Sequence, residues 1–246
     1  MSRLDGETSL SQISRRRIGR RLPIFIVAIL LIAQAVVSIC AVSGKSPTFD
    51  EPRSLMGAYL QVHGRDFRVN PEDPPLWKYL CGLALPPASI SANKNLSSWE
   101  LLTHHFPDQT RWCVDTLFRT SGTDADALFF RARCLMVPLA TVLGVIIAAW
   151  AWRLGGPLAS IVAVAVYCFD PNFIAHAPLL KGDVPITLAT LGAAMSVWSL
   201  GRRITALGVV ALTAFCAVGT CSKFSAILLI PIVAALLLAR AMSSKP

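Results

Sequence analysis

Two adjacent carboxylates, Asp50 and Glu51, stand a few residues after a long uncharged run that covers residues 22–44. A carboxylate can accept the proton of an attacking hydroxyl at neutral pH, so Asp50 is a candidate general base and Glu51 a candidate assistant that orients the acceptor. Pro52 is tolerated in the first turn of a helix, so we expect a helix to begin at Asp50 or Glu51. The positive end of that helix would favour an ionised Asp50. The alternative interpretation is that Asp50 only caps the helix.

Basic side chains follow the acidic pair and recur at the ends of the later apolar runs. Arginine and lysine are the usual partners of phosphate groups, so these side chains are candidates to hold an anionic leaving group. The alternative is that each one only reaches from an apolar surface to the lipid headgroups. We favour Lys78 and Lys223, and the other candidates are Arg65, Arg68, Arg131, Arg133 and Lys181.

Two further polar residues precede the run at residues 184–201. Asp183 is a candidate supporting or acceptor-side carboxylate, because an ionisable group at a membrane boundary is often functional, although capping of the next helix is an equal alternative. His176 is a candidate acceptor-side residue, for which a structural role is the more frequent one.

The composition is that of a membrane protein. Of the 246 residues, 54% are hydrophobic and only 15% are charged, which is too apolar for an ordinary soluble domain. The net charge of +9 does not indicate nucleic-acid binding, because the basic residues lie mostly between apolar runs. The seven cysteines show no paired metal-ligand spacing, and a disulfide between Cys81 and Cys113 is one alternative for two of them.

Six uncharged runs predict an all-α, polytopic helical bundle with about six transmembrane helices. A basic tail at residues 1–21 precedes the first run at residues 22–44, which we interpret as an uncleaved helix. The other five lie within residues 132–240, at 134–152, 154–169, 184–201, 204–222 and 224–239, and residues 241–246 end the chain. Arg153, Arg202, Arg203 and Arg240 then share the side of the basic tail, which predicts that the amino terminus and this side are cytoplasmic.

The long loop at residues 45–131 is the one sizeable polar unit, and it is predicted to be extracytoplasmic. Its aromatic residues can anchor a folded unit, and residues 76–90 are nearly all apolar, as in a buried or in-plane interfacial helix. Leu55, Met56, Tyr59 and Leu60 recur at helical spacing, so we also expect the helix after Asp50 to lie on the membrane.

Several motifs of this chain occur in an order that resembles the GT-C glycosyltransferases, and most closely the bacterial dolichyl-phosphate-mannose-protein mannosyltransferase-like proteins. These are related to protein O-mannosyltransferases and aminoarabinose transferases. The motifs are Thr48-Phe49-Asp50-Glu51-Pro52, Gly64-Arg65-Asp66-Phe67-Arg68, Asn70 to Lys78, Arg131-Ala132-Arg133, the turn from Phe169 to Pro178 with Asp183 after it, and Ser222-Lys223-Phe224-Ser225.

The resemblance implies an integral enzyme of the bacterial inner membrane. It would transfer a sugar, with mannose as one candidate, from a polyprenyl-phosphate donor to a protein, lipid or glycan acceptor, with inversion and with Asp50 as the base. The resemblance implies no organic cofactor, and it does not decide whether the enzyme depends on a divalent metal. Family members carry more spanning helices, so we expect this chain to be an amino-terminal portion. A non-catalytic subunit or truncated pseudo-enzyme that binds polyprenyl phosphate is the alternative, and a transporter is a third and weaker one.

Overall fold

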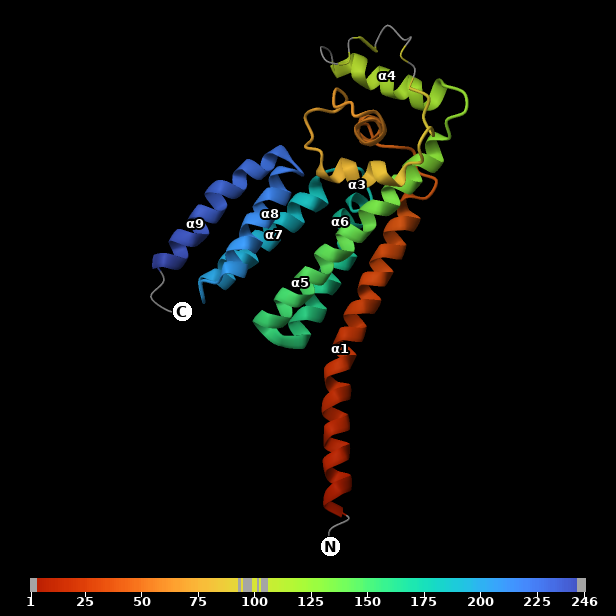
Figure 1. Ribbon diagram of the computed structural model, residues 1–246. Coiled ribbons are helices and arrows are strands. Elements are labelled where there is room, and N and C mark those ends of the chain that lie inside the picture. The colour runs from red at the N-terminus through yellow and green to blue at the C-terminus, as the bar shows by residue number, and fades with distance from the viewer. Residues whose placement is uncertain (1–3, 93, 95–98, 101, 103–105, 243–246) are drawn as a thin grey trace.

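The computed structural model describes residues 4–92, 94, 99–100, 102 and 106–242. All regular elements in these residues are helices, and no strand occurs among them, which confirms the all-helical expectation. Figure 1 shows a bundle of long helices with a smaller unit of short helices at one end. We call this unit, residues 43–124, the loop domain.

The longest packing interface of the bundle joins α1 (Leu4–Val42) to α5 (Ala125–Phe169). The first helix does not start at the apolar run but continues back through the basic segment. Gly144 of α5 lies directly against the side chains of Leu31 and Tyr167, so a Cβ at this position would collide with both. The small residue therefore permits the close approach of the two helices.

The helix α5 is a hairpin, because Gly156 has φ +78° and reverses the chain direction. A left-handed φ of this kind favours glycine, and Pro157 can begin the second arm because its missing N–H needs no partner there. Two hydrogen bonds join the arms, from Ser160 Oγ to the carbonyl of Ala148 (2.9 Å) and from Tyr167 Oη to that of Ala140 (2.7 Å). The expected turn between the second and third apolar runs is therefore present.

Four further helices of the described residues, α6 to α9, complete the bundle. A short α6 (Pro171–His176) leads to α7 (Asp183–Leu200), which packs against α8 (Ala206–Thr220) and α9 (Leu229–Met242). A 3₁₀ turn, Phe224–Leu228, precedes α9. Arg240 of α9 donates two hydrogen bonds to the carbonyl of Gly201 at the end of α7, and so ties the two helices at the end remote from the loop domain.

Four segments of the described residues are long and apolar enough to cross a membrane: Arg21–Val42, Ala125–Phe169, Asp183–Leu200 and Phe224–Met242. The α8 helix is equally apolar but shorter. Large apolar side chains of these helices are exposed, among them Phe25, Leu158, Val166, Leu207 and Ile230. Exposed apolar surface on this scale indicates an integral membrane protein.

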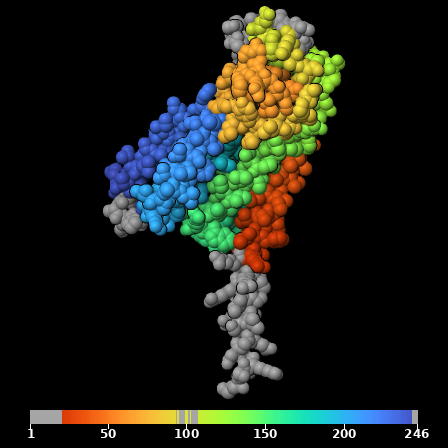
Figure 2. Space-filling model, viewed as in Figure 1, coloured from red at the N-terminus to blue at the C-terminus, as the bar shows by residue number. Residues whose placement is uncertain are grey.

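The loop domain consists of α2 (Glu51–Tyr59), a π-helical turn (Leu60–Gly64), α3 (Leu76–Ala84) and α4 (Phe106–Arg119). Figure 2 shows it, in orange and yellow, seated on one end of the bundle. Every residue of α2 is buried, so the expectation that this helix lies on the membrane is wrong. Its apolar stripe instead packs into a core with Trp77 and Trp112. The helix α3 does leave one apolar face exposed, formed by Tyr79, Leu80 and Leu83.

Cys81 and Cys113 are both buried free thiols in the core of the loop domain, so the disulfide considered from the sequence is not formed. Burial raises the pKa of Cys81 to about 12 and also raises the pKa of Cys113. Both residues therefore behave as small hydrophobic core residues.

Candidate functional site

Asp50 occupies the N-cap position of α2, as the proline pattern predicted, but its carboxylate makes no capping hydrogen bond. The side chain is 50% exposed and faces cations instead. Its Oδ1 lies 3.4 Å from Nη2 of Arg53, and its Oδ2 lies 3.9 Å from Nζ of Lys181. Asp50 therefore stands at the capping position without a capping hydrogen bond, and its half-exposed carboxylate faces Arg53 and Lys181.

A polar cavity of about 290 Å³ opens beside Asp50, at the contact between the loop domain and the bundle. Four separate segments form its wall: the start of α2, the turn before α3, the start of α7 and the residue before the 3₁₀ turn. The lining residues are Asp50, Arg53, Ser54, Asn70, Glu72, Asp73, Lys181, Gly182, Asp183 and Lys223.

Close backbone approaches hold these segments together. The amide of Leu76 donates to the carbonyl of Cys221 (3.0 Å), which fixes the loop domain to the end of α8. A Cβ on Gly182 would lie 2.6 Å from the carbonyl oxygen of Ser222, so only glycine lets the start of α7 come this near to Lys223. Asn70 has φ +55°, a conformation that asparagine tolerates better than most residues. Its backbone N–H donates to Oε1 of Gln109 (2.9 Å).

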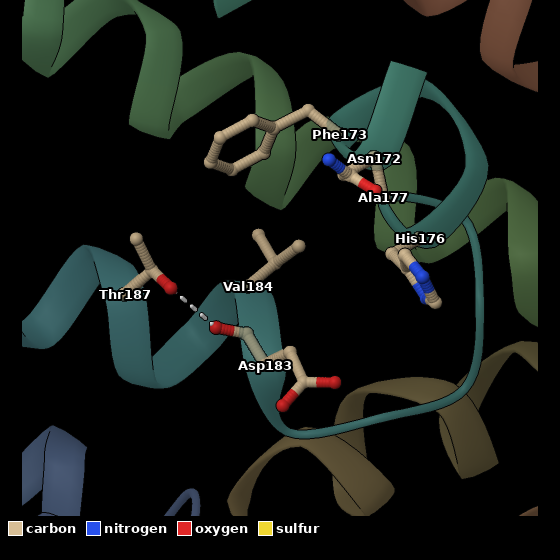
Figure 3. A pocket seen from close by; sticks show the side chains of 7 residues that line it. All are labelled: Asn172, Phe173, His176, Ala177, Asp183, Val184 and Thr187. Atoms are coloured by element: carbon tan, nitrogen blue, oxygen red, sulfur yellow. Dashed lines mark hydrogen bonds between the residues drawn. The ribbon is translucent and has the colours of Figure 1, made fainter. Parts of the chain in front are cut away.

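Asp183 and Lys223 form an ion pair in the wall of this cavity, with exposed side-chain fractions of 48% and 38%. Asp183 is the first residue of α7, and the N-cap position of that helix is Gly182, which makes no side-chain capping bond. The alternative that Asp183 only caps α7 is therefore not what the structure shows. Asp183 also lines a second cavity together with His176, which is shown in Figure 3.

Glu51 points away from the cavity and is completely buried. Arg133 holds it through two hydrogen bonds, from Nε to Oε1 (2.9 Å) and from Nη2 to Oε2 (2.6 Å). The amides of Thr48 (2.7 Å) and Leu180 (3.4 Å) also donate to this carboxylate. Burial alone would raise the pKa of Glu51, but these donors outweigh burial and hold its pKa below the usual value.

Arg133 in turn donates to three carbonyls, those of Val42 (3.4 Å), Lys45 (2.9 Å) and Ser46 (3.3 Å). The buried ion pair thus joins the end of α1, the start of α2 and the first turns of α5. Because Glu51 has no access to solvent, the geometry gives it a positioning role beside Asp50 and no direct contact with an acceptor. Arg133, considered from the sequence as a phosphate ligand, is fully engaged in this pair.

Lys78 does not reach the polar cavity. Its side chain is fully buried, and Nζ donates to the carbonyl of Asn70 (2.6 Å). This hydrogen bond stabilises the turn before α3. Burial lowers the pKa of Lys78 to about 8, against the opposing effect of the Asp73 and Glu72 charges. Among the two cations favoured from the sequence, only Lys223 lies where a ligand can meet it.

The arginines of the loop motif also lie outside the cavity. Arg68 pairs with Asp66 (2.7 Å), and its guanidinium stacks 4.3 Å from the ring centroid of Trp99. Hydrogen bonds from Arg68 lower the pKa of Asp66 against the effect of burial, and the same pair raises the pKa of Arg68. Arg65 is exposed in a left-handed conformation after the π-helical turn. Both arginines belong to the surface of the loop domain.

Arg53 and Lys181 are the cations that the structure adds next to Asp50. Arg53 is nearly buried and bridges Asp50 to Glu72. Sequence reasoning did not single out Arg53, although its position three residues after Asp50 places it on the same helical face. Lys181 was one of seven candidate cations, and nothing in the sequence showed that it approaches Asp50.

The cavity therefore combines four carboxylates, of which Asp50 is half exposed and lies beside two cations, with the three cations Arg53, Lys181 and Lys223. Such a site can accept a proton from a hydroxyl and stabilise negative charge on a departing group. Among the described residues, no three His, Cys, Asp or Glu side chains are grouped as metal ligands.

No protein-family model matches the chain, and no curated protein and no solved structure is significantly similar to it. The resemblance to GT-C enzymes therefore stays a prediction from the motifs, and the cavity has to be interpreted from its own chemistry.

Proposed function

We propose that the chain is a GT-C type membrane glycosyltransferase that moves a sugar, with inversion, from a polyprenyl-phosphate donor to an acceptor. The observation that carries this proposal is the half-exposed Asp50 beside Arg53 and Lys181, in a polar cavity at the end of apolar helices. A polyprenyl donor keeps its chain in the bilayer and its phosphate at the surface, so the reacting carbon has to lie at such a boundary.

In this proposal the chain crosses a bacterial inner membrane six times, through α1, the two arms of α5, α7, α8 and α9. The loop domain would be extracytoplasmic, and the amino terminus would be cytoplasmic. The direction reversals at Gly156, between α7 and α8 and after α8 support this topology, since they alternate the ends of the apolar segments (Figure 1). The basic residues 202–203 and Arg240 then lie opposite the loop domain, as the positive-inside rule requires.

The reaction is a single displacement at the anomeric carbon. The acceptor oxygen forms a bond to this carbon, its proton passes to Asp50, and the bond from the carbon to the phosphate oxygen breaks. The prenyl phosphate departs with the electron pair of that bond. Lys181 and Lys223 are placed to stabilise its charge, and Arg53 holds Asp50 in position.

A phosphate has to compete with Asp183 for Lys223, because the cavity wall holds carboxylates as well as cations. Both side chains of this pair are more than one third exposed, and exposed ion pairs contribute only about 0–1 kcal/mol. The donor phosphate is a diester with one negative charge, whereas the departing prenyl phosphate is a monoester with nearly two, so the departing group can displace Asp183 from Lys223 at little cost. Asp183 would then be free to orient the acceptor.

Substitution of Asp50 tests the proposal. The purified protein is given radiolabelled polyprenyl-phosphate sugars and a mixture of peptide and glycan acceptors. Asp50→Asn should lower the rate of transfer by about 10²–10⁴-fold, the usual contribution of a general base. Asp126→Asn is the matched control, because Asp126 is an exposed carboxylate of α5 outside the cavity. Equal transfer by the wild type and Asp50→Asn would refute the base role, and donor binding without any transfer would favour a non-catalytic binding subunit.

A further inference from the structure

A second cavity of about 240 Å³ lies between α6 and the start of α7, and its lining is mostly apolar. Phe173, Ala177 and Val184 supply the apolar surface. Figure 3 shows Phe173 and Ala177 on one side of the hollow and Val184 on the other, with His176 and Asp183 at its polar edge. Thr187 adds little polarity, because its hydroxyl donates to the carbonyl of Asp183 (2.8 Å).

Asp183 belongs to the walls of both cavities, so the apolar hollow adjoins the polar one. On the polar side Asp183 pairs with Lys223, and on the apolar side it is followed along α7 by Val184. A ligand that spans both cavities would therefore need an anionic group followed directly by an apolar chain. A free phosphate or a free sugar matches only the polar part.

The position in the fold restricts the apolar part further. The helix α6 is largely exposed, and α7 runs from this point along an apolar bundle. An apolar chain that leaves the hollow along α7 would continue beside lipid-facing surface and would not enter water. Burial of such a chain is favourable because it removes apolar surface from water.

We propose that the α6–α7 cavity binds the first isoprenoid units of a prenyl phosphate whose phosphate lies between Lys181 and Lys223. The proposal deepens and rests on the proposed function, since it locates the chain of the same donor. It assigns Phe173, Val184 and Thr187 to recognition of the chain, and Asp183 to the boundary between chain and phosphate.

The test uses geranyl phosphate that carries a photoreactive diazirine on its first isoprene unit and no sugar. After irradiation of the detergent-solubilised full chain, the labelled peptides are mapped by mass spectrometry. Label should appear on residues 173–187, and unlabelled geranyl phosphate should compete for it far better than inorganic phosphate. Label confined to other helices would overturn the proposal.

A pair of variants on one helix separates occupancy of the cavity from general damage to α7. Thr187→Trp places a large side chain into the hollow from its exposed rim and should lower labelling roughly tenfold or more. Thr190→Trp is the matched control, because Thr190 makes the same type of bond to a backbone carbonyl (2.8 Å) but does not line the cavity. Equal labelling of the two variants would also overturn the proposal.

The outcome is distinguishable from failure of the proposed function, because the probe contains no sugar to transfer. Label in the cavity without transferase activity would support the isoprenoid-binding site and refute only the proposed transferase function. If both tryptophan variants transfer sugar with equal Michaelis constants and the label lies on other helices, the proposed transferase function is supported and the isoprenoid-binding site is refuted.

Discussion

Removal of Arg133 should destabilise the protein more than removal of any exposed charge. The substitution Arg133→Met keeps an extended, mostly apolar side chain but deletes the guanidinium. Glu51 would then be a fully buried carboxylate with only the amides of Thr48 and Leu180 as donors. The loss would also leave the carbonyls of Lys45 and Ser46 without this donor.

The magnitude follows from the burial of the pair, whose side chains are 2% and 0% exposed. Breaking a buried ion pair by removal of one partner costs about 3–5 kcal/mol. For a chain of this size each kcal/mol lowers the melting temperature by about 2–4 °C, so a decrease of about 10 °C is expected. Glu51→Gln should cost less, because Arg133 keeps its three backbone acceptors. The double variant Glu51→Leu, Arg133→Met should be more stable than Arg133→Met alone, since no buried charge remains.

Thermal unfolding of the detergent-solubilised variants measures these differences. Arg131→Met is the matched control, because Arg131 lies two residues away on the same helix and is exposed. A decrease for Arg133→Met no larger than that for Arg131→Met would refute the reasoning. The reasoning would also be refuted if the melting temperature of the double variant fell by the sum of the decreases for Glu51→Leu alone and Arg133→Met alone. The two residues would then not act as a pair.

The decrease in folding stability at acidic pH is an independent measurement of the Glu51–Arg133 pair. The folded-state pKa of Glu51 is below its ordinary value of 4.5, so its ionised form contributes stability that is complete above about pH 4.5. This contribution is lost as the pH falls through the lowered pKa. The wild type should therefore lose stability more steeply below pH 4.5 than Glu51→Gln.

Two further substitutions test the loop domain. Lys78 has its pKa lowered from 10.5 to about 8, so its unfolded form binds more protons between these values and stability should rise as the pH increases from 8 to 10.5. Lys78→Met should abolish this rise in melting temperature, whereas Lys45→Met, which removes an exposed lysine, should retain it. Gly82→Ala should destabilise by about 1–3 kcal/mol, because its Cβ would collide with the carbonyl of Ala58 on α2 and the backbone would have to shift. Gly64→Ala, whose Cβ would meet only ordinary contacts at 3.7 Å and beyond, should unfold at nearly the wild-type temperature, and equal losses in both alanine variants would contradict the packing of α2 on α3.

Local rules acting on short stretches predicted the helical class and several element boundaries. The run of apolar residues at 22–44 predicted the apolar part of α1, Pro52 predicted a helix beginning at Asp50 or Glu51, and the break at Arg153 between two apolar runs predicted a turn inside α5. These features depend on hydrophobic length and backbone sterics, which a sequence carries by itself. The same local reasoning placed α2 on the membrane, because an apolar stripe does not state whether it packs against lipid or against Trp77 and Trp112.

The site itself was decided by tertiary structure. Asp50 and Glu51 are adjacent and chemically alike in the sequence, but the turn into α2 directs one carboxylate to a cavity and the other to Arg133, 82 residues further along the chain. Lys78 and Lys181 are likewise the same residue type in the sequence. In the structure Lys78 is buried and donates to the carbonyl of Asn70, whereas Nζ of Lys181 lies 3.9 Å from Oδ2 of Asp50. The sequence alone determined which ionisable groups the chain holds near its membrane boundary. Only the packing of the loop domain on the bundle decided which of them meet, because these contacts join segments that no local pattern relates.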